Sequence, residues 1–232
     1  MAPMLKHIGI AACSAEGAAL CYQTICLEGG QLLGPDAHPE VSMHTPSFAE
    51  YLKRLHRNDW DGVGELLLDS ARKLAKMGAD FVICPANTMH QALPLIEKRS
   101  PLPWLHIAEA VAAEATTRGF QRIAVTGTRW LVHSNIYTDK LNAVGLEVVR
   151  PNEDECRAID RIILEELVRG VFKPDATAYL QGVCAALKDR GCDAVALACT
   201  ELPLVLNDSN CALPTLDSTR LLARAALRRA VS

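Results

Sequence analysis

The sequence repeats itself at a fixed distance. Residues 78–82 (GADFV) resemble residues 191–195 (GCDAV), at an offset of 191 − 78 = 113. Two upstream segments, residues 8–10 and 123–125, also correspond, at an offset of 123 − 8 = 115. Gly-x-Asp before an apolar run is also a common connector between a helix and a strand. The matching upstream segments nevertheless favour an internal duplication, so we expect two similar halves.

Short apolar runs alternate with longer stretches that carry apolar residues at helical spacing. The runs are typical of strands at residues 8–12, 81–84, 123–126 and 194–198, and the longer stretches of helices at 60–77, 107–118, 156–171, 178–190 and 218–231. This alternation predicts an α/β protein with mostly parallel sheets, whose ligands bind at the carboxyl ends of the strands.

The predicted architecture is two pseudo-symmetric Rossmann-like α/β domains with the active site in the cleft between them. Residues 1–110 would form the first half, completed by a C-terminal helix at 217–232. Residues 111–216 would form the second half. Each half contributes one loop to the site, residues 85–88 and 198–201.

Composition excludes several classes of protein. No apolar run reaches the ~20 residues of a membrane span, and the N-terminus lacks a signal-peptide layout, so we expect a soluble, cytoplasmic protein. The net charge of −3 comes without a basic stripe, which argues against nucleic-acid binding. Nine scattered cysteines without zinc spacing predict no metal site. Seven of them read as reduced core residues: Cys13, Cys21, Cys26, Cys156, Cys184, Cys192 and Cys211.

The two remaining cysteines, Cys84 and Cys199, lie at strand ends. On the repeat register Cys199 corresponds to Ala86 (199 − 86 = 113). Both positions fall just beyond a strand, where a helix is expected to begin. The positive end of that helix would lower the pKa of the Cys199 thiol from about 8.5 toward neutrality. Free backbone N–H groups near Asn87, Thr88 and Thr200 could hold a carboxylate.

These loops, PANTMH at 85–90 and ACTE at 198–201, resemble those of aspartate/glutamate racemases, as do residues 8–10 and 126–128. The resemblance runs essentially the whole chain. It implies a homodimer that acts on a small amino acid or related carboxylate, without a pyridoxal or other cofactor. The sequence contains no Gly-rich phosphate-binding loop, which agrees with this expectation. Such enzymes remove the α-proton from one face and return one to the other with two opposed acid/bases, typically cysteines.

By resemblance, Cys199 is one catalytic acid/base, and Ala86 stands where its partner should be. Asn87, Thr88 and Thr200 would bind the α-carboxylate, with Thr128 and Ser14 beside them and Glu201, Glu16 and His90 in supporting roles. Purely structural roles are the alternatives. Thr200 and Ser14 could cap helices, residues 126–128 could form only a tight turn, and Cys199 could be an inert buried thiol.

Ala86 departs from the family pattern because it carries no titratable group. One interpretation is a degenerate or engineered racemase, including a form that only binds ligand. A second is that water, His90 or Glu16 protonates the second face. A third is that one cysteine does the chemistry alone. The last case resembles the arylmalonate decarboxylases, in which a single cysteine protonates a carbanion. Cys84 lies two residues earlier on the strand and would need a local shift to reach the site.

A second departure concerns the substrate. Aspartate racemases usually carry a basic residue in the segment that matches residues 38–40, where this chain has Glu40. A carboxylate beside a substrate carboxylate would cost on the order of 1 kcal/mol or more. The sequence therefore favours a Glu40 that points away, a compensating Arg161, Arg169 or Lys53, or a substrate that is not dicarboxylic.

Overall fold

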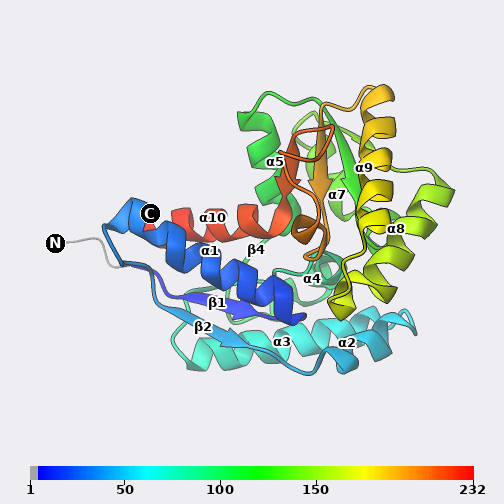
Figure 1. Cartoon of the computed structure of the whole chain (residues 1–232). Coiled ribbons are helices and arrows are strands. Elements are labelled where there is room, and N and C mark those ends of the chain that lie inside the picture. Colours follow the sequence, from blue (N-terminus) through cyan, green and yellow to red (C-terminus); the bar gives the residue numbers. More distant parts are fainter. Residues whose placement is uncertain (1–4) are drawn as a thin grey trace. The chain divides into compact units, whose positions relative to one another are not determined.

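The two halves of the repeat fold into two sheets of the same design (Figure 1). The computed structural model describes residues 5–232. The strands run in the order β2-β1-β3-β4 in one sheet and β6-β5-β7-β8 in the other, and every neighbouring pair is parallel. Their bounds are β1 (Ile8–Ala11), β2 (Val41–His44), β3 (Phe81–Ile83), β4 (Trp104–Leu105), β5 (Arg122–Thr126), β6 (Glu147–Val149), β7 (Ala194–Leu197) and β8 (Thr215–Asp217). The predicted pair of similar, parallel α/β sheets is confirmed.

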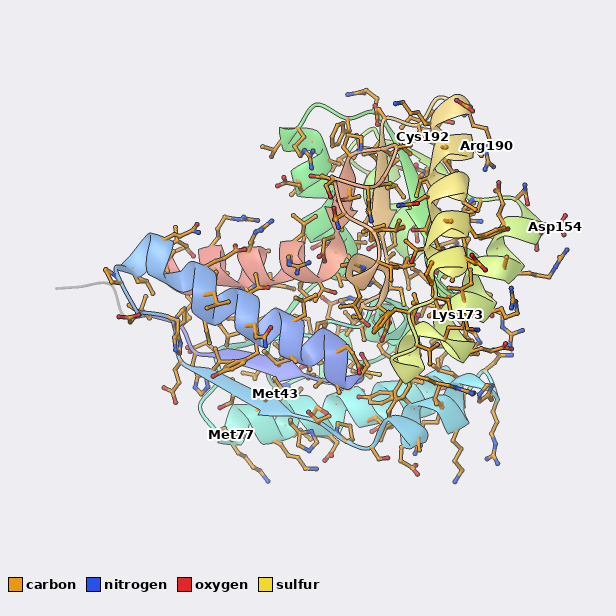
Figure 2. All side chains as sticks on the ribbon, viewed as in Figure 1. Met43, Met77, Asp154, Lys173, Arg190 and Cys192 are labelled. Carbon is orange, nitrogen blue, oxygen red and sulfur yellow. The ribbon has the colours of Figure 1, made fainter. Side chains whose placement is uncertain are left out.

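The chain divides into two compact units, one up to Ile107 together with Thr219–Ser232, the other Ala108–Ser218. The earlier helices are α1 (Ala15–Leu33), α2 (Phe48–Leu55), α3 (Trp60–Lys76), η1 (Asn87–Ala92), α4 (Leu93–Ile96), η2 (Glu97–Arg99) and α5 (Ile107–Thr117). The later ones are α6 (Arg129–Val132), α7 (Ile136–Asn142), α8 (Glu153–Glu165), η3 (Leu167–Arg169), α9 (Pro174–Asp189), η4 (Leu202–Leu204) and α10 (Ser218–Val231). Figure 2 labels Lys173 and Arg190, the capping residues at the two ends of α9.

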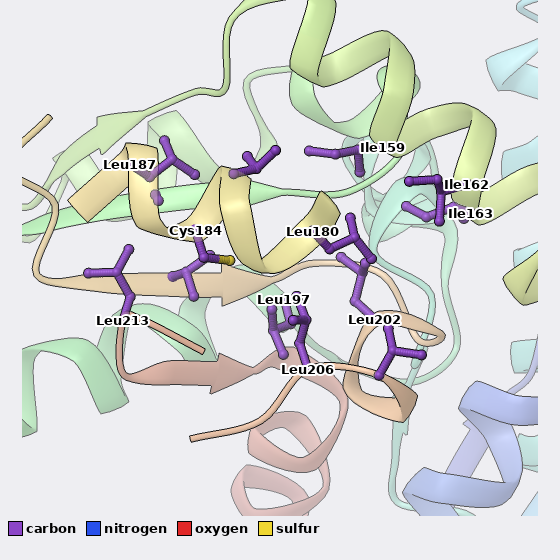
Figure 3. Packing of buried hydrophobic residues seen from close by; sticks show 14 of the residues in the cluster. Ile159, Ile162, Ile163, Leu180, Cys184, Leu187, Leu197, Leu202, Leu206 and Leu213 are labelled. Carbon is purple, nitrogen blue, oxygen red and sulfur yellow. The ribbon is translucent and has the colours of Figure 1, made fainter. Parts of the chain in front are cut away.

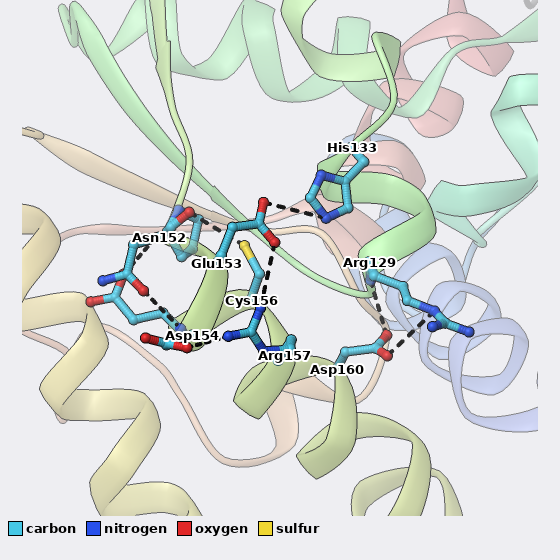
Figure 4. A network of polar contacts seen from close by, with 10 residues as sticks. Arg129, His133, Asn152, Glu153, Asp154, Cys156, Arg157 and Asp160 are labelled. Carbon is cyan, nitrogen blue, oxygen red and sulfur yellow. Dashed lines mark hydrogen bonds and ion pairs between the residues drawn. The ribbon is translucent and has the colours of Figure 1, made fainter.

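The prediction of one helix over residues 156–171 is wrong at both ends. Helix α8 begins earlier because the Asn152 side chain accepts a hydrogen bond from the Glu155 backbone, and the Glu155 carboxylate accepts one from the Asn152 backbone. It ends at Glu165. The apolar spacing continues through the short turn η3, which ends at Gly170 with a left-handed φ of 71°. Figure 4 shows the polar network at the start of α8.

The repeated Gly-x-Asp motif has the same structural role in each unit. The Asp80 carboxylate accepts a hydrogen bond of 2.7 Å from the backbone N–H of His7, just before β1. The Asp193 carboxylate accepts one of 2.7 Å from the backbone N–H of Gln121, just before β5. The glycine two residues before each aspartate has a left-handed φ, of 91° and 85°. Each motif therefore turns the chain out of a helix and anchors the neighbouring strand.

Each sheet has its own hydrophobic core. In the first unit, α1 and α10 pack with β1 and β3 through residues such as Ile25, Leu222 and Leu227. In the second, α8 and α9 cover β5 and β7 (Figure 3). All nine cysteines are free, but Cys26 and Cys211 are only partly buried, which corrects the expectation that both are core residues.

Two structural features are absent from residues 5–232. No helix in that range has the length and apolar character needed to cross a membrane. Within the same described range, His, Cys, Asp and Glu side chains form no group of three or more that could hold a metal ion.

Candidate active site

The strand register makes Ala86 and Cys199 equivalent positions. Ile8 of β1 pairs with Phe81 of β3, and Ile123 of β5 pairs with Ala194 of β7. Counting five residues on from Phe81 and from Ala194 gives positions 86 and 199 (81 + 5 and 194 + 5). Position 86 follows the carboxyl end of β3, which lies beside β1, and position 199 follows the carboxyl end of β7, which lies beside β5. Parallel sheets bind ligands at these ends of their strands. The repeat register predicted from sequence is confirmed.

Cys199 belongs to a short buried loop after β7. Its side chain is partly buried, and the thiol donates a hydrogen bond of 2.9 Å to Oε2 of Glu201. Thr200 and Glu201 are themselves buried. A buried carboxylate beside a thiol provides a nearby proton acceptor, which is the arrangement that an acid/base cysteine needs.

The pKa of Cys199 lies in the opposite direction to the prediction. Burial raises the pKa of the Cys199 thiol well above its ordinary value, and the charge and hydrogen bond of Glu201 raise it further. Backbone N–H groups of Glu201 and Thr200 oppose this only in part. The expected helix dipole is missing because the loop leads into η4, a 3-10 turn of three residues. Cys199 is therefore a protonated thiol in the ligand-free protein.

The turn at residues 126–128 packs against the backbone just before Cys199. The backbone N–H of Ala198 donates to the Thr126 carbonyl at 2.9 Å. A Cβ added to Gly127 would lie 2.9 Å from the Ala198 carbonyl oxygen, so only glycine allows this approach. Thr128 is the N-cap residue of α6, yet its side chain makes no capping hydrogen bond. Residues 126–128 thus form a tight turn, and a substrate role for Thr128 stays a prediction.

The corresponding loop of the first unit begins at Ala86, the N-cap residue of η1. Ala86 and Thr88 are partly exposed, whereas Asn87 is buried. His90 is only 1% exposed, and its Nε2 lies 2.9 Å from the Cys84 carbonyl oxygen. This hydrogen bond fixes the imidazole beneath the loop, so His90 supports the loop and is poorly placed to protonate a substrate.

Cys84 does not replace the missing partner. Its side chain is 0% exposed, and burial raises the pKa of its thiol to about 12. Sequence reasoning missed Tyr51, a fully buried residue: burial raises the pKa of its hydroxyl, and the nearby Cys84 and Cys13 raise it further. It also missed His106, whose ring contacts the His90 ring edge-on at a centroid distance of 4.6 Å. No spacing in the sequence marks these contacts, because they join separate elements.

The loop after β1 carries Ser14 and Glu16. Ser14 occupies the N-cap position of α1, but the expected capping hydrogen bond from its side chain is not formed. Glu16 lies exposed in the first turn of the helix. A substrate contact of Ser14 remains a prediction.

Glu40 lies at the wrong edge of the sheet for the role considered above. The backbone N–H of Ile8, the first residue of β1, donates to the Glu40 carbonyl at 2.9 Å. Glu40 therefore precedes β2 at the amino edge, whereas ligands bind at the carboxyl edge. Its side chain is 76% exposed and lies 3.8 Å from Nδ1 of His7. This position fits the alternative in which Glu40 points away from the substrate.

With this geometry established, similarity to known proteins identifies the family. Residues 13–226 match the family model described as Asp/Glu/Hydantoin racemase. The chain belongs to this family. The broad specificity amino-acid racemase RacX of Bacillus subtilis (strain 168) is 28% identical to this racemase-family chain over 169 residues, or 72% of the chain and 71% of RacX.

Solved structures agree with the family assignment. A provisionally named Asp/Glu racemase from Yersinia pestis superposes with a TM-score of 0.90 at 29% identity, covering 98% of this chain and 100% of the other. An aspartate racemase homologue from Pyrococcus horikoshii OT3 gives 0.84 at 26% identity, covering 99% and 100%. Glutamate racemase from Francisella tularensis, solved with D-glutamate, gives 0.66 at 13% identity over 95% and 79%, which shows a shared fold.

Proposed function

We propose that the protein is a cofactor-independent amino-acid racemase in which Cys199 is the acid/base on one face of the α-carbon. The observation that carries the proposal is the Cys199 thiol at the carboxyl end of β7, hydrogen-bonded to Glu201 at 2.9 Å. Family membership supports the reaction class. Asn87, Thr88 and Thr200 hydrogen-bond to the substrate α-carboxylate, with Thr128 and Ser14 as further contacts.

Glu201 acts as a positioning residue for Cys199. Because the thiol is protonated at rest, its proton must leave before the sulfur can accept an α-proton. The 2.9 Å hydrogen bond gives that proton a path to the Glu201 carboxylate. The thiolate then takes the α-proton, and charge develops on the substrate α-carboxylate. Donors aimed at that charge stabilise the carbanion.

Position 86 supplies no acid for the second face. The Ala86 methyl group has no acidic proton, and both Cys84 and His90 are buried. In our proposal a water molecule therefore delivers the second proton. Water is a weaker acid than a thiol, so deuterium exchange at the α-carbon runs ahead of racemisation.

The substrate class is a small amino acid. RacX is named a broad specificity racemase, which supports testing many side chains. Glu40 lies at the amino edge of its sheet, so it raises no objection to aspartate or glutamate. We also propose that the protein is cytoplasmic and forms a homodimer. Light scattering of the purified protein tests the dimer.

One-base decarboxylation of the arylmalonate type is the second candidate. It needs a single protonated cysteine that delivers its proton to a carbanion, and the raised pKa of Cys199 together with Ala86 favours it. Release of carbon dioxide from an aryl-substituted malonate, lost in Cys199→Ser, would support this candidate. If no carbon dioxide is released, the racemase proposal is unaffected.

The proposed function is tested by NMR in heavy water, following loss of the α-proton signal over L- and D-amino acids that include aspartate and glutamate. Exchange should be abolished or reduced by about 100-fold or more in Cys199→Ser, since acid/base groups contribute about 10²–10⁴-fold. Cys26→Ser is the matched control, because Cys26 is a partly buried cysteine in helix α1. No exchange with any amino acid would overturn the proposal.

A further inference from the structure

A cleft of about 450 Å³ lies between α6 and α8 in the second unit. Three arginines and three carboxylates line it, so their charges cancel. A ligand with several charges of one sign would meet as much repulsion as attraction there, whereas a ligand with one charge of each sign would not. The residues that we assign to the racemase reaction are not among those that line the cleft. The cleft is therefore a further candidate for ligand binding.

Hydrogen bonds hold the two walls of the cleft in place (Figure 4). The backbone N–H of Arg129, the first residue of α6, donates to Oδ1 of Asp160 on α8 at 2.9 Å. Nε of Arg129 lies 3.7 Å from Oδ2 of the same carboxylate, which is only 14% exposed. The buried Cys156 thiol donates to the Pro151 carbonyl at 3.3 Å. These contacts join α6 to α8, so the cleft is formed before a ligand arrives.

Four charged residues form one row along α8 at intervals of four residues: Glu153, Arg157, Arg161 and Glu165. Residues four apart lie on the same face of a helix, so all four side chains can reach the cleft. The two arginines in the middle of the row repel each other. An anionic group bound between them would relieve that repulsion, and the carboxylates at the ends of the row would attract a cation.

Two members of the row, Arg161 and Glu165, are exposed and uncommitted. Within residues 5–232, no ion pair or hydrogen bond joins either side chain to another residue. They do not pair with each other because an acidic residue four positions after a basic one is the less favourable order in a helix. The guanidinium can donate to a carboxylate and the Glu165 carboxylate can accept from an ammonium group. Their side chains start roughly 5–6 Å apart, which suits two charges on one small molecule.

We propose that this cleft is a binding site for a small zwitterionic amino acid, in addition to the site of the proposed racemase reaction. The ligand carboxylate lies between Arg157 and Arg161, and its ammonium group donates to Glu165. Leu164 and Cys156 are the apolar residues of the lining, so they favour a short apolar side chain. Binding at the cleft does not require turnover.

The experiment titrates the full-length, ¹⁵N-labelled protein with L-alanine and, separately, with propionate, which has the same carbon skeleton without the ammonium group. We expect saturable shifts of the backbone amide signals of Arg129, His133 and Arg161. L-alanine should bind at least about threefold more tightly than propionate, the size of effect that one exposed ion pair provides.

Three variants separate the two charges. Arg161→Gln should weaken binding of both compounds by about tenfold, since it removes a charged hydrogen-bond donor. Glu165→Gln should weaken L-alanine by about threefold and leave propionate unchanged. Arg57→Gln is the matched control, because Arg57 is an exposed arginine of the first unit, and it should change neither.

Two results would contradict the proposal. Saturable shifts that are missing from the cleft, or that persist unchanged in Arg161→Gln, would rule out binding there. Equal affinity for L-alanine and propionate would rule out a zwitterionic ligand. Shifts at Asn87, Thr88 and Thr200 report the proposed racemase site separately, so the failure of one proposal is distinguishable from failure of the other.

Discussion

At Cys199, burial and the Glu201 carboxylate act together to keep a proton on sulfur. A cysteine in this state is an acid at rest and becomes a base only when its proton moves away. The 2.9 Å hydrogen bond to Glu201 is suited to that step. In our proposal the site delivers a proton from one side, and the alanine at position 86 limits two-sided chemistry.

Restoring a thiol at position 86 should restore two-base chemistry. We expect Ala86→Cys to raise the racemisation rate by about 100-fold, because a positioned acid/base replaces water. Ala86 is partly exposed, so the larger side chain can be accommodated. Racemisation is followed by circular dichroism of the amino acid. Ala86→Ser, of similar size but with a far weaker acid, is the control, and equal rates in both variants would contradict a role for the thiol.

At the scale of elements, the site loop depends on a neighbouring turn more than on a helix. The turn at residues 126–128 approaches Ala198 so closely that a Cβ on Gly127 would lie 2.9 Å from the Ala198 carbonyl oxygen. The same Cβ would lie 2.8 Å from Cδ2 of Leu131. The leucine methyl can move, but the carbonyl belongs to the backbone beside Cys199. Strain at Gly127 is thus passed directly to the loop that carries Cys199.

Gly127→Ala should therefore impair both stability and activity. We expect a loss of about 1–3 kcal/mol in unfolding free energy, typical of overpacking, with a fall in kcat. Urea denaturation and racemisation assays measure the two effects. Gly182→Ala is the matched control, since a Cβ at that position in α9 meets no atom within 4 Å. There we expect stability to rise by about 0.5–1 kcal/mol.

For the whole molecule, buried thiols make the unfolding free energy fall as the pH becomes alkaline. The pKa of Cys84 is raised to about 12 in the folded protein, against about 8.5 in an unfolded chain. Below about pH 8.5 both states keep the proton, so the stabilising contribution is fully present. As the pH rises further, only the unfolded chain loses its proton, and stability falls by about 1.4 kcal/mol per pH unit for this thiol.

The matching experiment compares urea unfolding near pH 8 and near pH 10 under reducing conditions. Between pH 8 and pH 10 we expect the unchanged protein to lose about 2 kcal/mol more unfolding free energy than Cys84→Ala loses. The variant itself is less stable at both pH values, because it leaves a cavity. An identical pH dependence in both proteins would show that Cys84 does not carry this effect.

The sequence by itself determined the two-unit α/β plan, the register of the repeat and the equivalence of Ala86 and Cys199. These follow from local pattern: apolar spacing selects strands and helices, and the Gly-x-Asp connector has the same backbone role wherever it occurs. Helix ends were less predictable where apolar spacing continued past the last helical residue, as beyond Glu165.

Only the tertiary structure decided the electrostatics and the contacts between distant segments. The pKa of Cys199 is set by burial and by how the Glu201 side chain folds back, and the three-residue turn that follows removes the expected helix dipole. Glu40 lies at the amino edge because it precedes β2, a strand of four residues that the apolar runs in the sequence did not mark. Packing and burial are sums over many neighbours, so they exist only once the chain has folded.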